Sequence, residues 1–516
     1  MINNRYSKVG AITLGVTALT ALSGYPYTME EIREALDVGH YAEAARMVEA
    51  ELADGSTENT GELYEAIGEA KYNIPGMRRE SVLAFTEASS KGVADAFLYL
   101  GRLAMLDYDF QKAQQMFGKY KAQKQKSRKP LDSEFEYDEA DLKEAILQFG
   151  RQQDIVVIDA VKVPLKEFYK HLRLPLSAGR VVEPMSLPID ADDEDLGPSA
   201  FITESGDEMM WSAVNDSTGL YRLTEATLLM DGTLSDPREL PDFLGEDGDA
   251  INPFLSADGT TLYFASNGSG TMGGYDIFIA SRDPLTGEYL QPVNAGIPFN
   301  SSADDYVLAI DEENGVGWWA TDRHFLPDGM ITLYVYELPE TRVNLMADDD
   351  EKRLRARLDD IRLTWTSPED EEGADGDGDE DGTADDETAD EDAEPSPGTR
   401  KDEAYYKNLA AEIRRIQPGQ QPRRHDCEIP LGKGRYIYSA DDVETAAQKK
   451  IVDEYVAARK KYDTDMVRLR EMRLDFARQG SRAMTREIDE LEQSVDRQRT
   501  LLTGILSSLY RSLGAK

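Results

Sequence analysis

Short apolar runs separated by turn residues dominate the middle of the chain. Two of them, Thr261–Ser266 and Tyr275–Ala280, predict strands, because short runs of β-branched and aromatic residues bounded by turn residues are typical of strands. The first run follows the tight-turn dipeptide Asp258-Gly259, and the glycine-rich stretch 268–274 joins the two runs. Glycine favours both places because it has no Cβ and adopts positive φ at no steric cost.

The same pattern recurs on both sides of this stretch. Upstream, Glu208–Ser212 follows a Ser-Gly-Asp turn, and downstream Gly317–Arg323 and Ile331–Leu338 follow Asn-Gly and Asp-Gly turns. The aromatic centres of the units are about 55 residues apart, at Trp211, Phe264 and Trp319. Repeats of about 40–50 residues with four short strands each predict the blades of a β-propeller, and the units here run slightly long.

A family resemblance rests on three consecutive segments, SADGTTLYFAS, GGYDIF and PVNAGIPFNSSADDY, within about Asn252–Arg323. They resemble the TolB-type, WD40-like propeller repeat, called PD40, of secreted Bacteroidetes proteins. Relatives of this kind combine helical tetratricopeptide repeats, such a propeller and often a peptidoglycan-binding OmpA-like domain, and one is a component of the type IX secretion apparatus. The resemblance implies an envelope protein with protein partners, although no OmpA-like segment is recognisable in this sequence.

We expect structural roles for the residues of the repeat motif. Aspartates at turns accept hydrogen bonds from backbone N–H groups, aromatic side chains pack between blades, and Gly273 with Gly274 provides backbone freedom. Ser256 and Asp258 also resemble the Asp-box of sialidases, in which this pair stabilises a turn. The motif comprises Ser256, Asp258, Gly259, Tyr263, Phe264, Gly273, Gly274, Asp276, Asp305, Trp319 and Asp322.

Residues 29–150 predict a helical region. Leu100-Gly101, Ala113 and Phe117 have tetratricopeptide spacing, with small residues where paired helices approach and bulky ones between them. Degenerate earlier repeats are indicated near residues 41–48 and 67–85. A solenoid of this kind offers a concave face for a peptide or a neighbouring domain, and a plain helical bundle is the alternative.

Between the helical region and the clear repeats, Asp154–Val163 and Ala178–Met185 predict further strands, because both are rich in aliphatic residues. We therefore place the propeller over residues 151–345. Only three blades are clear, whereas propellers usually have four or more. Two arrangements stay open: divergent blades within about 150–250, or an incomplete stack of sheets.

The low-complexity segment 366–398 predicts a disordered linker, because it consists largely of Asp, Glu and Gly and has almost no apolar residue to offset the entropy of ordering. Asp377, Asp379 and Asp381 match the start of an EF-hand loop, but Thr388 stands where a bidentate Glu is needed. We therefore expect no EF-hand, and weak calcium binding by the whole tract stays open.

Residues 400–516 predict a short strand pair, Glu428–Ser439, followed by two long helices. Apolar residues recur at spacings of three and four over 451–476 and again over 484–509, with one polar break at Gln498 and a turn at Gly480-Ser481. This pattern predicts an antiparallel coiled-coil hairpin. The apolar heptad residues either form the core between the two helices of the hairpin or mediate oligomerisation.

The first 24 residues predict a signal peptide, with Arg5 and Lys8 before the apolar run Val9–Leu22 and a small-residue cleavage motif ending near Ser23. We expect an exported protein, periplasmic or associated with the outer membrane, with no transmembrane segment after cleavage. An uncleaved anchor is the alternative. Cys427 is the single cysteine, so the sequence predicts neither an internal disulfide nor a cysteine zinc site.

The net charge and the motifs of the chain exclude several classes of function. The net charge of −42 argues against nucleic-acid binding, which needs a basic surface. The four histidines lie far apart, and no nucleophile elbow, P-loop or zinc-protease motif occurs, so we predict no enzyme, metal or cofactor. We expect a non-enzymatic scaffold or protein–protein interaction protein that supports an envelope or secretion complex. The alternative is a protein that binds peptidoglycan or another polysaccharide through the propeller face, with a glycan-cleaving enzyme as a distant third.

Together these features predict a multidomain α+β fold. It consists of a tetratricopeptide-like α-solenoid, a TolB/WD40-like β-propeller that is few-bladed or incomplete, an acidic linker and a C-terminal antiparallel coiled-coil hairpin.

Overall fold

The computed structural model describes residues 27–513 except 55–58, 188, 190–194, 230–233, 242–243, 246, 284–285, 340, 368–399, 402, 416–428, 433–434, 438–439, 441–442, 444 and 480–481. The predicted signal peptide, nearly all of the acidic segment, Cys427 and the Gly480-Ser481 turn lie outside the described residues.

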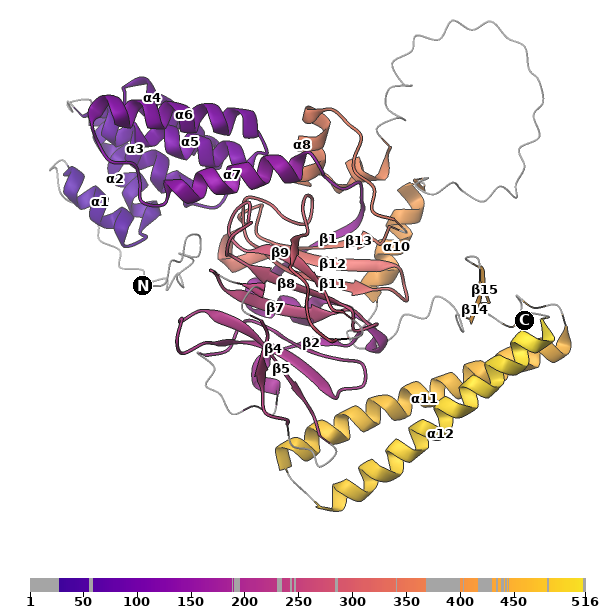
Figure 1. Cartoon of the computed structure of the whole chain (residues 1–516). Coiled ribbons are helices and arrows are strands. Elements are labelled where there is room, and N and C mark those ends of the chain that lie inside the picture. Colours follow the sequence, from indigo (N-terminus) through magenta and orange to yellow (C-terminus); the bar gives the residue numbers. More distant parts are fainter. Residues whose placement is uncertain are drawn as a thin grey trace, which may run out of the picture.

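Seven helices form the N-terminal region, and consecutive helices pack side by side (Figure 1). Two close contacts set this packing. A Cβ at Gly68 would lie 2.8 Å from the Phe85 ring, and one at Gly101 would lie 2.3 Å from the Phe117 ring, so the helices approach closely only because these residues are glycine. The helices are α1 (Met29–Asp37), α2 (Tyr41–Asp54), α3 (Thr60–Tyr72), α4 (Arg78–Ser90), α5 (Asp95–Leu106), α6 (Phe110–Ser127) and α7 (Phe135–Phe149).

Three antiparallel sheets form the middle of the chain (Figure 1). The first has the order β2-β3-β4-β5-β6 and comprises β2 (Arg180–Val182), β3 (Ala200–Ile202), β4 (Glu208–Val214), β5 (Tyr221–Thr227) and β6 (Arg238–Glu239). The second has the order β10-β9-β8-β7 and comprises β7 (Ala250–Leu255), β8 (Thr261–Ser266), β9 (Asp276–Ser281) and β10 (Val293–Asn294). The third has the order β1-β13-β12-β11 and comprises β1 (Val156–Pro164), β11 (Asp305–Asp311), β12 (Val316–Thr321) and β13 (Met330–Glu337).

The sheets repeat one strand order. In the second sheet four consecutive strands are antiparallel neighbours, and β3–β6 of the first sheet follow the same order. In the third sheet β1, which precedes the other sheets in the chain, takes the fourth place beside β13. The aromatic centres Trp211, Phe264 and Trp319 lie in β4, β8 and β12, the second strand of each unit, and all three are buried. The spacing seen in the sequence is therefore a repeat of strand positions, and none of these three sheets closes on itself.

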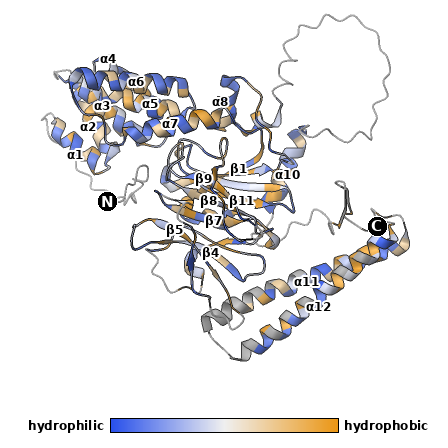
Figure 2. Ribbon diagram, in the orientation of Figure 1, coloured by the Kyte–Doolittle hydropathy of each residue, from blue (hydrophilic) through white to orange (hydrophobic). Residues whose placement is uncertain are grey.

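The second sheet lies between the other two, because β7 contacts strands of the first sheet and β11 contacts β7, β8 and β9. One apolar core runs through all three, with Phe201, Phe254 and Trp318 as members from successive sheets. Figure 2 shows hydrophobic residues gathered along these central strands. Burial of apolar side chains from both facing sheets accounts for the stacking.

Short helices lie beside the sheets. They are η1 (Leu165–His171), η2 (Leu176–Ala178), η3 (Pro184–Ser186), η6 (Pro327–Gly329), α8 (Asp349–Arg357), η7 (Ile361–Trp365) and α10 (Glu403–Arg415). Three of them, η1, η7 and α10, contact strands of the third sheet. The Trp365 indole N–H donates to the Val157 carbonyl at 2.7 Å, and the Val157 N–H donates to the Thr364 hydroxyl at 2.9 Å. These bonds satisfy the outer edge of β1 at that position.

The C-terminal part contains a strand pair, β14 (Ile429–Gly432) and β15 (Arg435–Ile437), and two long helices, α11 (Ala446–Gln479) and α12 (Arg482–Ser512). The two helices pack along one another in opposite directions through apolar residues of the predicted seam. The polar break at Gln498 is buried, and its amide donates to Asp465 on the other helix at 2.5 Å. Among the described helices, none is both long enough and apolar enough to cross a membrane.

Candidate functional site

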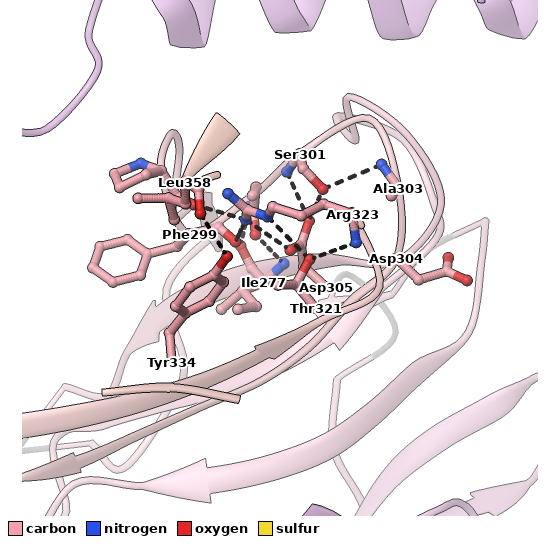
Figure 3. Close-up of polar contacts among 12 residues, drawn as sticks. Ile277, Phe299, Ser301, Ala303, Asp304, Asp305, Thr321, Arg323, Tyr334 and Leu358 are labelled. Carbon is pink, nitrogen blue, oxygen red and sulfur yellow. Dashed lines mark hydrogen bonds and ion pairs between the residues drawn. The ribbon is translucent and has the colours of Figure 1, made fainter. Parts of the chain in front are cut away.

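Three motif aspartates, Asp276, Asp305 and Asp322, belong to a polar cluster where the second and third sheets meet the helical region. Figure 3 shows its centre, where Asp305 and Arg323 lie close together. We call this cluster the polar junction and define it as Asp276, Asn300, Ser301, Asp304, Asp305, Thr321, Asp322 and Arg323. Its members come from the starts of β9 and β11, the end of β12 and the connections beside them. Chain segments far apart in sequence therefore meet in one buried cluster.

Asp276 and Asp305 occupy matching positions in the polar junction, because each is the first residue of a strand. The Asp276 carboxylate accepts from the Met272 N–H at 3.0 Å, and the Asp305 carboxylate accepts from the Ser301 N–H at 2.7 Å. In both cases the donor lies four residues before the aspartate. Each carboxylate therefore holds the loop that leads into its strand.

Arg323 is the cation of the polar junction, and its side chain is 4% exposed. The guanidinium ties the third sheet to α8 and to the connection after β10. It donates to the carbonyls of Pro298 at 2.8 Å, Phe299 at 3.0 Å and Ala356 at 3.0 Å, to the Thr321 hydroxyl at 3.2 Å and to Asp305 at 3.1 Å. These partners use most of the donors of the planar guanidinium, as a buried arginine requires.

Asp304 and Asp322 face one another across the same junction. The Asp304 N–H donates to the Asp322 carboxylate at 2.8 Å, and the Asp322 N–H donates to the Asp304 carbonyl at 2.9 Å. Asp304 also accepts from the Tyr275 N–H at 2.9 Å and the Tyr306 hydroxyl at 3.2 Å. Burial raises the pKa of both carboxyl groups, and the neighbouring charge of Asp304 raises the pKa of Asp322 further.

Burial also raises the pKa of Asp276 well above its ordinary value, and the nearby charge of Asp305 adds to the effect. Burial raises the pKa of Asp305 as well, but Arg323 opposes that shift. The two matching aspartates thus differ in electrostatics: one has a cationic partner, whereas the other is stabilised as the neutral acid.

The helical region contacts the polar junction directly. Arg78 on α4 donates to the Arg323 carbonyl at 3.1 Å, and its guanidinium stacks over the Phe325 ring at 4.8 Å. The Ser302 hydroxyl donates to the Met105 carbonyl on α5 at 3.3 Å. Beside it, Arg353 of α8 donates to the side chain of Asp107 at 3.0 Å. Met272 and Ile297 join an apolar cluster made mainly of α5, α6 and α7 residues.

Three motif residues, Ser256, Asp258 and Gly259, form the β7–β8 turn, outside the polar junction. The Ser256 hydroxyl donates to the Asp258 carboxylate at 2.5 Å, and the Thr260 N–H donates to the same carboxylate at 2.9 Å. Gly259 has a φ of +71°, which suits glycine. Half-buried Tyr263 follows in β8, where it packs against the third sheet's core. These contacts hold a turn.

The structure gives a different reason for Gly273 than the backbone freedom expected from the sequence. Neither Gly273 nor Gly274 has a positive φ. A Cβ at Gly273 would instead lie 2.5 Å from the Ser302 carbonyl carbon, so the position needs space for a neighbouring backbone. The Gly274 N–H donates to the Ala303 carbonyl at 3.3 Å, beside that contact.

The chemistry of the polar junction is that of an internal connection. Within the described parts of the chain, no group of three or more His, Cys, Asp or Glu residues has a geometry that could hold a metal ion. Trp318 and Trp319 are 1% and 0% exposed, so neither presents a ring face to solvent. The carboxylates are bonded to the loops and side chains of the sheets, and the link to the helical region comes from Arg78, which donates to the Arg323 carbonyl.

Sequence reasoning did not identify Arg78 or Arg323 as members of the site. Arg323 stands directly after the strand that contains Trp319, and a cation beside a cluster of aspartates in so acidic a chain is a usable signal. The sequence around Arg78 gives no indication of its role, because its partner lies 245 residues away in sequence.

The chain was also compared with known protein families, curated proteins and solved structures, and it matches none of them. Its function therefore has to be inferred from its own geometry.

Proposed function

We propose that this chain is an exported, non-enzymatic scaffold of the cell envelope that holds partner proteins in a fixed arrangement. The sequence supports export through its first 24 residues, and the PD40-like segments support an envelope role. We interpret the helical region as tetratricopeptide-like, the three sheets as three propeller-like repeats and α11–α12 as a coiled-coil hairpin. Each of these folds is commonly an interaction surface.

The observation that carries this proposal is the polar junction. Arg323 makes buried hydrogen bonds that connect α8, the third sheet and the connection after β10, and Arg78 adds a bond from the helical region. Buried and geometrically specific polar contacts favour one relative orientation over others. Surfaces on the helices and on the sheets are thereby held at a fixed distance, which is what a scaffold requires.

We propose glycan binding as the second candidate function, because the same geometry gives it less support. Recognition of a sugar by this region would use aromatic and acidic side chains on one open face. The aromatic residues Trp318 and Trp319 are buried, and the converging aspartates lie under the helices. Glycan binding is therefore one of the possible results of the experiment described next.

The test is cross-linked affinity purification of the tagged full chain from envelopes of cells that express it, followed by mass spectrometry. We expect one or two dominant protein partners, with cross-links on both the helices and the sheets. The variant Arg78→Ala should loosen the connection and reduce joint recovery of partners, whereas Lys126→Ala on the exposed face of α6 is the matched control. Cross-links confined to the chain itself, with co-purifying glycan, would replace the scaffold by a polysaccharide-binding function.

A further inference from the structure

Two neighbouring cavities lie on either side of the end of α10. One, of about 480 Å³, is lined by α10, η7 and β1, and the other, of about 470 Å³, is lined by α10, β1, β13 and the segment at the end of η1. Asp159 and Arg414 line both cavities. We call the two cavities together the α10 groove. Each has a volume typical of a ligand pocket.

The α10 groove is basic, although the chain as a whole carries a net charge of −42. Its lining includes Lys162, His171, Arg173, Lys407, Arg414 and Arg415. Among the described residues that line it, Asp159 is the one acid. Arg414 already pairs with Asp159 at 2.6 Å, and Lys407 pairs with Glu403 outside the groove. Arg173 also has an interaction within the protein, so the exposed basic groups beside these pairs are Lys162 in one cavity and Arg415 in the other. These two groups give the groove a local positive charge.

The walls between these charges are aliphatic. Val161, Leu333, Val335 and Ile413 line the cavity beside β13, and Ile158 and Ile361 line the other. Trp318 and Trp365 also contribute, at 1% and 9% exposed, and Ile158, Leu333, Val335 and Ile413 are buried to a similar degree, at 2–5% exposed. The half-buried aliphatic side chains of the lining are Val161 and Ile361. A sugar ring would need an open aromatic face to stack on. The lining favours aliphatic groups that lie close to carboxylates.

A peptide ligand in this groove cannot pair as an extra strand with the unpaired edge of β1. The Ala160 N–H donates to the Asp159 side chain at 2.9 Å, and Pro164 has no N–H to offer. The edge at Val157 is covered by η7. A ligand in the α10 groove would therefore be recognised through its side chains, by charge and by apolar contact.

We propose that the α10 groove binds an acidic peptide segment of a partner protein, in which aliphatic residues alternate with glutamates or aspartates. This proposal rests on the scaffold function proposed above, since its ligand is a protein. Lys162 and Arg415 are exposed and lie in different cavities, so carboxylates spaced along one peptide can reach both. The aliphatic residues between them pack against Val161 and Ile361, and Arg414 stays paired with Asp159.

Fluorescence anisotropy with the full chain tests the proposal. The probe is a labelled ten-residue peptide of alternating Leu and Glu, the second probe replaces each Leu by Ser, and the third is a labelled oligogalacturonate. We expect the Leu–Glu peptide to bind at least about tenfold more tightly than either other probe, and its affinity to fall between 50 and 200 mM salt because exposed charge contacts are screened.

Matched variants connect binding to the groove. Lys162→Glu with Arg415→Glu reverses two exposed charges in the groove, and Lys126→Glu with Lys129→Glu reverses two exposed charges elsewhere. The groove variant should bind the peptide at least about tenfold more weakly at unchanged melting temperature, and the control variant should bind like the parent. Equal binding by both variants, or tighter binding of the oligogalacturonate, overturns the proposal. If the envelope partners are still recovered in that case, the scaffold function survives without this site.

Discussion

Asp276 and Asp305 hold the loops that lead into β9 and β11 in the same way, yet in the described part of the chain only Asp305 pairs with a cation. Each accepts a hydrogen bond from the backbone N–H four residues earlier. Arg323 donates to Asp305 at 3.1 Å, whereas one oxygen of Asp276 has no hydrogen-bond partner in the described part of the chain. The same hydrogen bond from a loop to an aspartate therefore occurs in two electrostatic forms, an ion pair at Asp305 and a buried carboxyl group with a raised pKa at Asp276.

This difference predicts unequal effects of an isosteric substitution. Asp305→Asn leaves the buried Arg323 without its counter-charge and should lower the free energy of unfolding by about 3 kcal/mol, as is usual for broken buried pairs. Asp276→Asn keeps the acceptor for Met272 and Asn294 and should cost no more than about 1 kcal/mol. Urea denaturation at pH 7 measures both values. Equal losses would show that Asp276 also has a cationic partner.

The facing pair Asp304 and Asp322 predicts that stability depends on pH. Both pKa values are raised by burial, so the folded chain retains protons that the unfolded chain releases. Their contribution is fully present below the ordinary carboxyl pKa of about 4 and is lost as the pH rises through the raised values. The charged groups that act on the pair are Asp305 and Arg78, and Arg323 pairs with Asp305 beside them.

The measurement compares Asp322→Asn with the parent from pH 4 to pH 8 by urea denaturation. The asparagine keeps the acceptor for the Asp304 N–H but cannot ionise. The parent should therefore lose stability relative to the variant as the pH rises. A difference that stays constant over this range would remove Asp322 as a titrating group.

The repeat uses glycine for two physical reasons, space for a neighbouring backbone at Gly273 and a positive φ at Gly259, and substitutions at these positions test both. Gly273→Ala would place a Cβ 2.5 Å from the backbone of Ser302, and it should cost about 2 kcal/mol or more because a backbone must move. Gly259→Ala meets no atom within 4 Å but has to adopt a φ of +71°, so it should cost about 1 kcal/mol. Thermal and urea unfolding rank the two variants. The reverse order would mean that backbone conformation dominates packing here.

The polar pair between the long helices, buried Gln498 and half-buried Asp465, predicts an effect on pairing specificity. Gln498 donates to Asp465 across the two helices, and its carbonyl oxygen has no partner among the described atoms. Replacing both residues by leucine should raise the stability of the helix pair, since a partly satisfied polar pair gives way to apolar contact. It should also permit other registers or association between chains. Sedimentation velocity checks association, and a strictly monomeric double variant would show that the pair does not control pairing.

Much of the local structure followed from residue patterns. The strands around Phe264 and Trp319, the helices around Gly101 and the two long C-terminal helices appear where periodicity and turn residues predict them. Those features depend on neighbours in sequence, so local pattern is sufficient to identify them. The place of Val156–Pro164 beside β13 could not be predicted, because its partner lies more than 160 residues away and many edges were possible.

By itself, the sequence determined the α+β composition, the repeating strand units and the acidic character of this chain. Only the tertiary structure decided that the motif aspartates serve an internal junction, that Arg78 and Arg323 complete it and that basic residues gather beside α10. The physical reason is distance along the chain. Turns and amphipathic faces depend on residues a few positions apart, whereas burial, pKa shifts and charge pairing depend on which distant segments pack together.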